Sequence, residues 1–173
     1  RRDSLPCYGM DFVRSPHLET LARRGIVFDN CVSVCPVCQP ARAAFMTGQY
    51  PSVLGVTDNF QWIRPGTPTI AERFRDAGFH TAAIGKMHFH PWDNPEGFAY
   101  RIIAEDKRHI FRPDHYTRFL EENGFRREHP AVVPGYADNL GAFESPLPED
   151  CHIDSFIGRE AVNEIRSRLA FLR

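Results

Sequence analysis

A cysteine, a proline and an arginine are closely spaced in the segment Cys38-Gln39-Pro40-Ala41-Arg42. Cysteine can provide a nucleophile, and proline is favoured in the first turn of a helix, where its missing N–H costs nothing. The segment therefore predicts a loop that ends at Cys38 and a helix that starts beside it. Cys38 and Arg42 would share one face of this helix because they are four residues apart. The helix N-terminus adds N–H donors and partial positive charge, so we expect a reactive side chain at an anion-binding site.

A lysine and a histidine follow a predicted strand further along the chain. Residues 79–84 form an apolar run with β propensity between Gly78 and Gly85, which predicts a buried strand. Lys86 and His88 come directly after it. Ligands of open α/β sheets bind at the carboxyl ends of strands, and residues two apart on an extended chain face the same way. The chain has two lysines in all, which favours a functional role for Lys86 over a solvated surface role.

Both segments resemble motifs of the sulfatase family. The first motif is Cys or Ser, any residue, Pro, Ser or Ala, Arg, a hydrophobic pair and Thr-Gly; it is matched here by Cys38, Pro40, Ala41, Arg42, Phe45, Met46, Thr47 and Gly48. The second motif is Gly-Lys-x-His, matched by Gly85, Lys86 and His88. Gln39 departs from the pattern, because the family usually carries a small residue there.

The resemblance implies a sulfuric ester hydrolase that cleaves a small-molecule or saccharide sulfate ester. A maturation enzyme would oxidise Cys38 to formylglycine, whose hydrate is the nucleophile, and Arg42 would stabilise it. Lys86 and His88 would hold the sulfate group. Related enzymes carry an asparagine of the substrate pocket near position 59, so Asn59 is a candidate for substrate binding, with a plain turn role as the alternative.

The resemblance also implies a divalent metal ion. Ca²⁺ is favoured over Mg²⁺ or Mn²⁺. The formylglycine at position 38 would be one ligand, and the other ligands, including a pair of aspartates, would lie outside this chain. We expect no nucleic-acid partner, because the chain has a net charge of −1 without a basic skew.

Predicted helices and strands alternate along the chain, which indicates an α/β layered domain with a mainly parallel sheet. The resemblance makes this an incomplete alkaline-phosphatase-like α/β/α domain, with residues 1–173 as the N-terminal part of one catalytic domain. We expect a core with both motifs over residues 1–88, an insertion or loop region over 89–150 and a helix over 151–173. A capping box at Thr69 and Glu72 predicts a helix that stops at Gly78.

The composition is that of an ordinary globular chain, with 42% hydrophobic and 25% charged residues among 173. We expect no membrane segment, since no apolar run approaches the ~20 residues of a transmembrane helix. No signal peptide is visible, but the chain does not begin with methionine, so its compartment is left unassigned.

Three alternatives stay open. A phosphonate or phosphate diester hydrolase of the same fold is one, although such relatives usually lack the pair Lys86 and His88. The spacing of Cys31, Cys35 and Cys38 also resembles the motif of radical S-adenosylmethionine enzymes, in which three thiolates hold a [4Fe–4S] cluster. The third alternative is an inactive or binding-only fragment.

Overall fold

The computed structural model describes residues 2–105 and 110–171. The chain divides into two units, Arg1–Ser33 and Val34–Arg173, so the predicted core over residues 1–88 spans both of them. No helix in the described ranges is both long and apolar enough to cross a membrane.

The first unit contains two short 3-10 helices and one α-helix: η1 (Arg2–Ser4), η2 (Pro6–Tyr8) and α1 (Pro16–Arg24). Pro16 stands at the first helical position of α1, where proline is favoured. After α1 the chain is irregular, and the Tyr8 hydroxyl donates a hydrogen bond to the carbonyl oxygen of Phe28 (2.8 Å).

The second unit combines a small parallel sheet with helices. Its elements are α2 (Cys38–Thr47), α3 (Pro51–Leu54), α4 (Ile70–Asp76), β1 (Ala82–Gly85), β2 (Tyr100–Ile103), α5 (His115–Glu122), η3 (Pro130–Val132), η4 (Glu149–Cys151) and α6 (Ile153–Phe171). Strands β1 and β2 pair in parallel, with Ala82 opposite Tyr100 and Gly85 opposite Ile103. A parallel pair of strands, with helices before β1 and after β2 along the chain, confirms the α/β class that the sequence predicted. Strand β2 lies inside the region 89–150, which we expected to be an insertion or loop.

Helix α4 begins at the predicted capping box. The hydroxyl oxygen of Thr69 accepts a hydrogen bond from the N–H of Glu72 (3.1 Å), and the Glu72 carboxylate accepts one from the N–H of Thr69 (2.9 Å). The loop before β2 packs tightly on this helix end: a Cβ atom at Gly97 would lie 2.4 Å from the backbone nitrogen of Glu72. Position 97 therefore requires glycine, and the helix end holds the loop that leads into β2.

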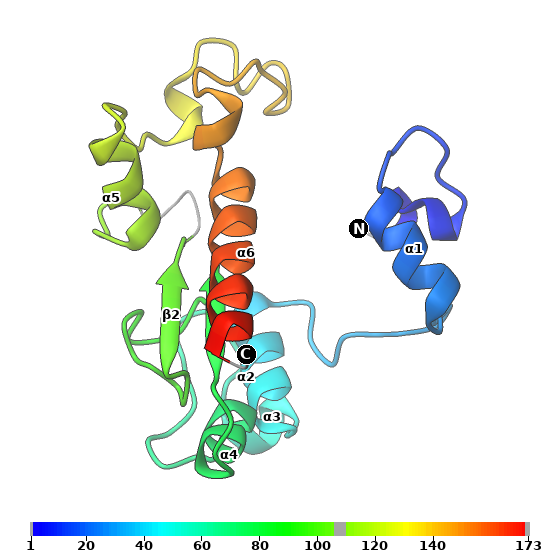
Figure 1. The fold of residues 1–173 in the computed structure, drawn as a ribbon, viewed down its shortest axis with the longest axis vertical. Coiled ribbons are helices and arrows are strands. Elements are labelled where there is room, and N and C mark those ends of the chain that lie inside the picture. The colour runs from blue at the N-terminus through cyan, green and yellow to red at the C-terminus, as the bar shows by residue number, and fades with distance from the viewer. Residues whose placement is uncertain (1, 106–109, 172–173) are drawn as a thin grey trace. The chain divides into compact units, whose positions relative to one another are not determined.

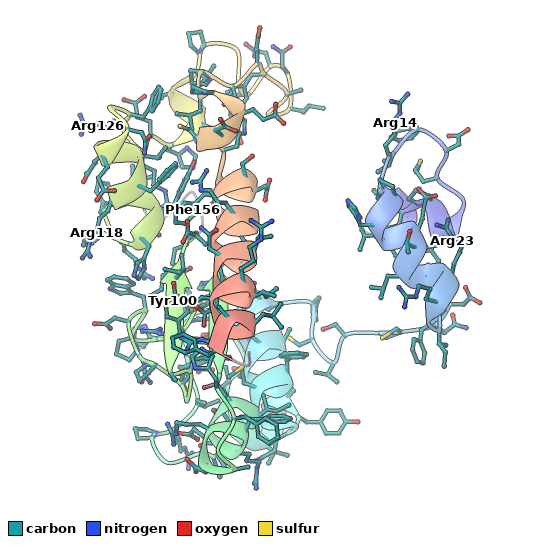
Figure 2. All side chains as sticks on the ribbon, viewed as in Figure 1. Arg14, Arg23, Tyr100, Arg118, Arg126 and Phe156 are labelled. Carbon is teal, nitrogen blue, oxygen red and sulfur yellow. The ribbon has the colours of Figure 1, made fainter. Side chains whose placement is uncertain are left out.

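Two hydrophobic clusters pack the helices of this unit against the strands. One joins α2, α4 and the two strands and contains Met46, Ala71, Met87, Phe89 and Ile103. The other joins β2, α5 and α6 and contains Ala104, Tyr116, Leu120, Cys151 and Phe156. Helix α6 lies beside the strands (Figure 1), and Phe156 reaches from α6 toward α5 (Figure 2). The first cluster includes Met87 and Phe89, so buried contacts position the segment that carries Lys86 and His88.

Candidate active site

Cys38 is the first residue of helix α2, as the sequence predicted. The helix ends at Thr47, and Gly48 follows with a φ of 70°, its N–H donating a hydrogen bond to the carbonyl oxygen of Ala44 (2.8 Å). This is the αL stop that glycine provides most readily. The N-cap residue, Val37, makes no side-chain hydrogen bond to the helix, so the first N–H groups of α2 need an acceptor from elsewhere.

Asn59 supplies that acceptor. Its Oδ1 accepts a hydrogen bond from the N–H of Gln39 (3.0 Å) and lies 3.3 Å from the Sγ of Cys38, which can donate its S–H. The side chain acts as an N-cap, although it comes from a loop about 20 residues further along the chain. The structure therefore brings Asn59 to Cys38, where the sequence had left a turn role open.

Arg42 connects helix α2 to the segment after β1. Its Nη1 donates hydrogen bonds to the carbonyl oxygens of Lys86 (3.0 Å) and Met87 (3.3 Å). A cleft of about 220 Å³ is lined by Arg42, Lys86 and apolar residues that include Phe45 and Phe89. Two cationic side chains thus border one cleft. Arg42 stands one helical turn after Cys38 in α2, although Cys38 itself does not line the cleft.

The segment that carries Lys86 and His88 is not an extension of the strand. β1 ends at Gly85, which has a φ of 110°, and His88 has a φ of 60°. The premise of an extended chain at these two residues was therefore wrong. The backbone turns because glycine permits the first bend and because hydrogen bonds hold the second. Gln39 provides one of these, its Nε2 donating to the carbonyl oxygen of His88 (3.3 Å).

Glu105 is a site residue that sequence reasoning missed. It is fully buried, and its Oε1 accepts hydrogen bonds from the N–H groups of His88 (2.8 Å) and Met87 (3.3 Å). Its own N–H donates to Asp114 Oδ2 (2.7 Å). Arg127 donates to the carbonyl oxygen of Glu105 and pairs with Asp114 (2.8 Å). Glu105 opens a charged run in the sequence, which indicates a solvated surface rather than a buried support.

Burial also shifts the pKa values of titratable groups near the strands, among them Glu96 and His115. Burial raises the pKa of Glu96, whose carboxylate accepts hydrogen bonds from Trp62 Nε1 (2.7 Å) and Asn94 Nδ2 (2.6 Å). Burial likewise lowers the pKa of His115, whose Nδ1 accepts the N–H of Ile103 at the end of β2 (3.0 Å). Both groups have a structural role, because each accepts hydrogen bonds from other residues of the fold.

Within residues 2–105 and 110–171, no three or more His, Cys, Asp or Glu side chains cluster in a way that could hold a metal ion. Cys31 belongs to the first unit, whereas Cys35 and Cys38 belong to the second. No two of the five cysteines, all of which lie in the described ranges, are joined by a disulfide. The described residues therefore do not make up the ligand set of a divalent ion, and the ligands that we expect outside this chain stay a prediction.

The model of the sulfatase family matches residues 1–140. The chain belongs to the sulfatase family. It is 43% identical over 95 residues to a choline-sulfatase of Rhizobium meliloti, covering 55% of this chain and 19% of that protein. It is 31% identical over 137 residues to an N-acetylglucosamine-6-O-sulfatase of Bacteroides thetaiotaomicron, covering 79% of this chain and 23% of that protein. The chain thus spans about a fifth of the length of these curated relatives.

Solved structures agree on the fold. A phosphonate monoester hydrolase of Agrobacterium radiobacter superposes with a TM-score of 0.70 over 95% of this chain and 36% of that chain, at 20% identity, which shows the fold alone. A second structure, solved in complex with its substrate D-glucosamine-2-N,6-O-disulfate, has a TM-score of 0.53 and 33% identity, over 58% of this chain and 20% of that chain. The sulfatase chain described here therefore has the alkaline-phosphatase-like fold that the sequence predicted.

Proposed function

We propose that the sulfatase containing this chain hydrolyses a sulfate monoester of a small molecule or saccharide, with the residue at position 38 as nucleophile. The observation that carries this proposal is the network of hydrogen bonds that joins both motifs. Asn59 binds the N-terminus of α2 beside Cys38, and Arg42 binds the segment of Lys86 and His88. A choline-sulfatase and an N-acetylglucosamine-6-O-sulfatase among the relatives support this class of substrate.

Formylglycine fits at position 38. The Sγ of Cys38 lies 3.3 Å from Asn59 Oδ1, so a hydroxyl group there could donate a hydrogen bond to the same acceptor. The positive end of helix α2 favours an anion at this place. Formylglycine would supply a hydrated aldehyde. One hydroxyl would attack sulfur as the S–O bond to the alcohol breaks, and the second would then lose its proton and expel sulfate as the aldehyde re-forms, a step that plain cysteine cannot perform. Its formation from Cys38 requires a maturation enzyme.

The charges of the site suit an anionic transition state. Arg42 would stabilise the oxygen of the nucleophile, while Lys86 and His88 would neutralise charge on the sulfuryl oxygens. Asn59 would position the nucleophile and contact the substrate. We further propose that a divalent ion, Ca²⁺ before Mg²⁺ or Mn²⁺, binds at position 38 with ligands from outside this chain.

Peptide mass spectrometry across Cys38, on full-length protein from its native host, tests the proposal directly. We expect an aldehyde at position 38 and turnover of an aryl sulfate that Cys38→Ala abolishes. Cys31→Ala is the matched control, since Cys31 is exposed and should leave turnover unchanged. Wild-type turnover in Cys38→Ala would refute the assignment, and loss of turnover in Cys31→Ala together with bound iron would favour the iron–sulfur alternative.

A phosphonate or phosphate diester hydrolase is the second candidate. The superposition on the phosphonate monoester hydrolase supports it as a fold-level alternative, whereas the lysine and histidine at positions 86 and 88 favour a sulfatase. The ratio of kcat/KM for an aryl sulfate to that for an aryl phosphonate distinguishes the two. We expect the sulfate to be preferred, and a preference for the phosphonate would overturn the assignment.

A further inference from the structure

A buried glutamine and a buried glutamate bind opposite sides of His88. Gln39 Nε2 donates to the carbonyl oxygen of His88 (3.3 Å), and Glu105 Oε1 accepts from its N–H (2.8 Å). The exposed fraction is 3% for Gln39, 0% for Glu105 and 7% for His88. Hydrogen bonds at such depth are stronger than surface ones, because little water competes for the same groups.

The conformation of His88 explains why two such bonds are needed. Its φ of 60° lies in the left-handed region. Residues other than glycine seldom adopt this conformation, and the surrounding structure must hold them in it. The bond from Gln39 holds the peptide plane after His88, and the bond to Glu105 holds the plane before it. Together they set both backbone angles of His88, and these angles set the direction in which its Cα–Cβ bond points.

Each of the two residues is itself anchored to a different part of the site. Gln39 follows Cys38 in helix α2, so its side chain connects the helix of the nucleophile to His88. Glu105 is held by Asp114 and Arg127, which connect it to the N-terminus of α5. The pair therefore connects helix α2 and the N-terminus of α5 to His88. Gln39 makes its connection from a position where the family usually carries a small side chain.

We propose that Gln39 and Glu105 are positioning residues that place the imidazole of His88 relative to the nucleophile at position 38. This inference rests on the proposed function, in which His88 contacts the sulfuryl group. A misplacement of about 1 Å of a reacting group reduces turnover roughly 10²-fold. We therefore expect loss of either bond to lower kcat more than it raises KM.

Three variants of the full-length matured enzyme test the pair. Gln39→Met keeps the length of the side chain without the donor, Glu105→Leu removes the acceptor, and Glu105→Gln keeps an acceptor oxygen without the charge. We expect kcat to fall about 10- to 100-fold in Gln39→Met and Glu105→Leu. Glu105→Gln should stay within about threefold of wild type, because the amide oxygen accepts the same two N–H groups.

Tyr116→Phe is the control for general destabilisation. It removes a buried hydrogen bond of similar length, from the Tyr116 hydroxyl to the carbonyl oxygen of Cys151 (2.9 Å), in the second hydrophobic cluster. Its kcat should equal that of wild type. Hydrogen exchange of the amides at positions 87 and 88 is the second readout: exchange should accelerate in Glu105→Leu and remain slow in Glu105→Gln and Tyr116→Phe.

Wild-type kcat in both Gln39→Met and Glu105→Leu would overturn the inference, as would an equal loss in Glu105→Gln and Glu105→Leu. If Glu105→Leu does not fold, Gln39→Met and Glu105→Gln still decide, since the inference requires a loss in the first and none in the second. An enzyme without any sulfate ester hydrolysis would instead refute the proposed function, while the exchange rates at positions 87 and 88 would still test how His88 is held.

Discussion

Replacing Asn59 by aspartate should change stability and activity in opposite directions. Asn59 Oδ1 caps helix α2 by accepting the N–H of Gln39 (3.0 Å), because Val37 at the N-cap contributes no side-chain hydrogen bond. In Asn59→Ala this N–H loses its acceptor, and we expect the free energy of unfolding to fall by about 1 kcal/mol. Asn59→Asp keeps an acceptor and adds negative charge at a helix N-terminus, which favours folding by about 0.3–1 kcal/mol.

The same charge should oppose catalysis. Because Asn59 Oδ1 lies 3.3 Å from Cys38 Sγ, a sulfuryl group under attack at position 38 would stand roughly 5 Å from the new carboxylate. Two unit charges at about 5 Å repel by about 3 kcal/mol at an effective dielectric constant of about 20, which corresponds to a loss of roughly 10²-fold in kcat/KM. The aspartate variant would thus be at least as stable as wild type but far less active.

Urea unfolding and aryl sulfate kinetics on the full-length enzyme measure the two effects. A drop in stability as large in Asn59→Asp as in Asn59→Ala would refute the capping role. Wild-type kcat/KM in Asn59→Asp would refute the position of the substrate beside Asn59. A smaller loss at high salt would agree with the electrostatic cause, since salt screens the repulsion.

Three further predictions concern the two cationic side chains of the cleft, the titration of a buried histidine and a buried leucine of the core. Arg42→Ala and Lys86→Ala should each remove on the order of 3 kcal/mol of transition-state stabilisation, seen as a fall in kcat/KM for an aryl sulfate; a loss below about threefold in either variant would contradict its role. His115 should make folding sensitive to acid, because its pKa is lowered by burial and its Nδ1 accepts the N–H of Ile103. As the pH falls, His115 takes up a proton in the unfolded chain before it does so in the folded chain. The contribution of His115 to the free energy of unfolding should therefore be fully present above a pH of about 6.5 and decrease as the pH falls below it. In His115→Asn, which keeps an acceptor that does not titrate, urea unfolding should show a weaker decrease; an unchanged decrease would exclude His115 as its cause. Leu120→Ala should lower the free energy of unfolding by about 2–5 kcal/mol, because the exposed fraction of Leu120 is 1%, and an effect below about 1 kcal/mol would contradict its place in the core.

Local patterns allowed several elements to be predicted correctly. The start of helix α2 at Cys38 and the capping box of α4 depend on residues within a few positions of one another. Such signals are local, because proline, glycine and capping side chains act on the backbone beside them. The helix that we expected over residues 151–173 corresponds to α6 (Ile153–Phe171).

Other features could not be predicted because they depend on distant partners. Strand β2 has four residues and contains Arg101, so its apolar pattern is weak, and its pairing with β1 defines it. Strand β1 begins at Ala82, three residues after the predicted apolar run starts. The left-handed turn at His88 carries only a weak local signal, since histidine adopts this conformation more often than most residues but far less often than glycine.

The sequence by itself determined the family and the residue types of the site. Cys38 and Arg42 were recognisable as a pair because helical spacing places them on one face, whatever surrounds them. Tertiary structure decided how the two motifs meet. The hydrogen bond that Gln39 donates to His88 and the one that Glu105 accepts from His88 join residues 49 and 17 positions apart. Such contacts form only when separate helices and strands pack together, and they turn two short motifs into one site.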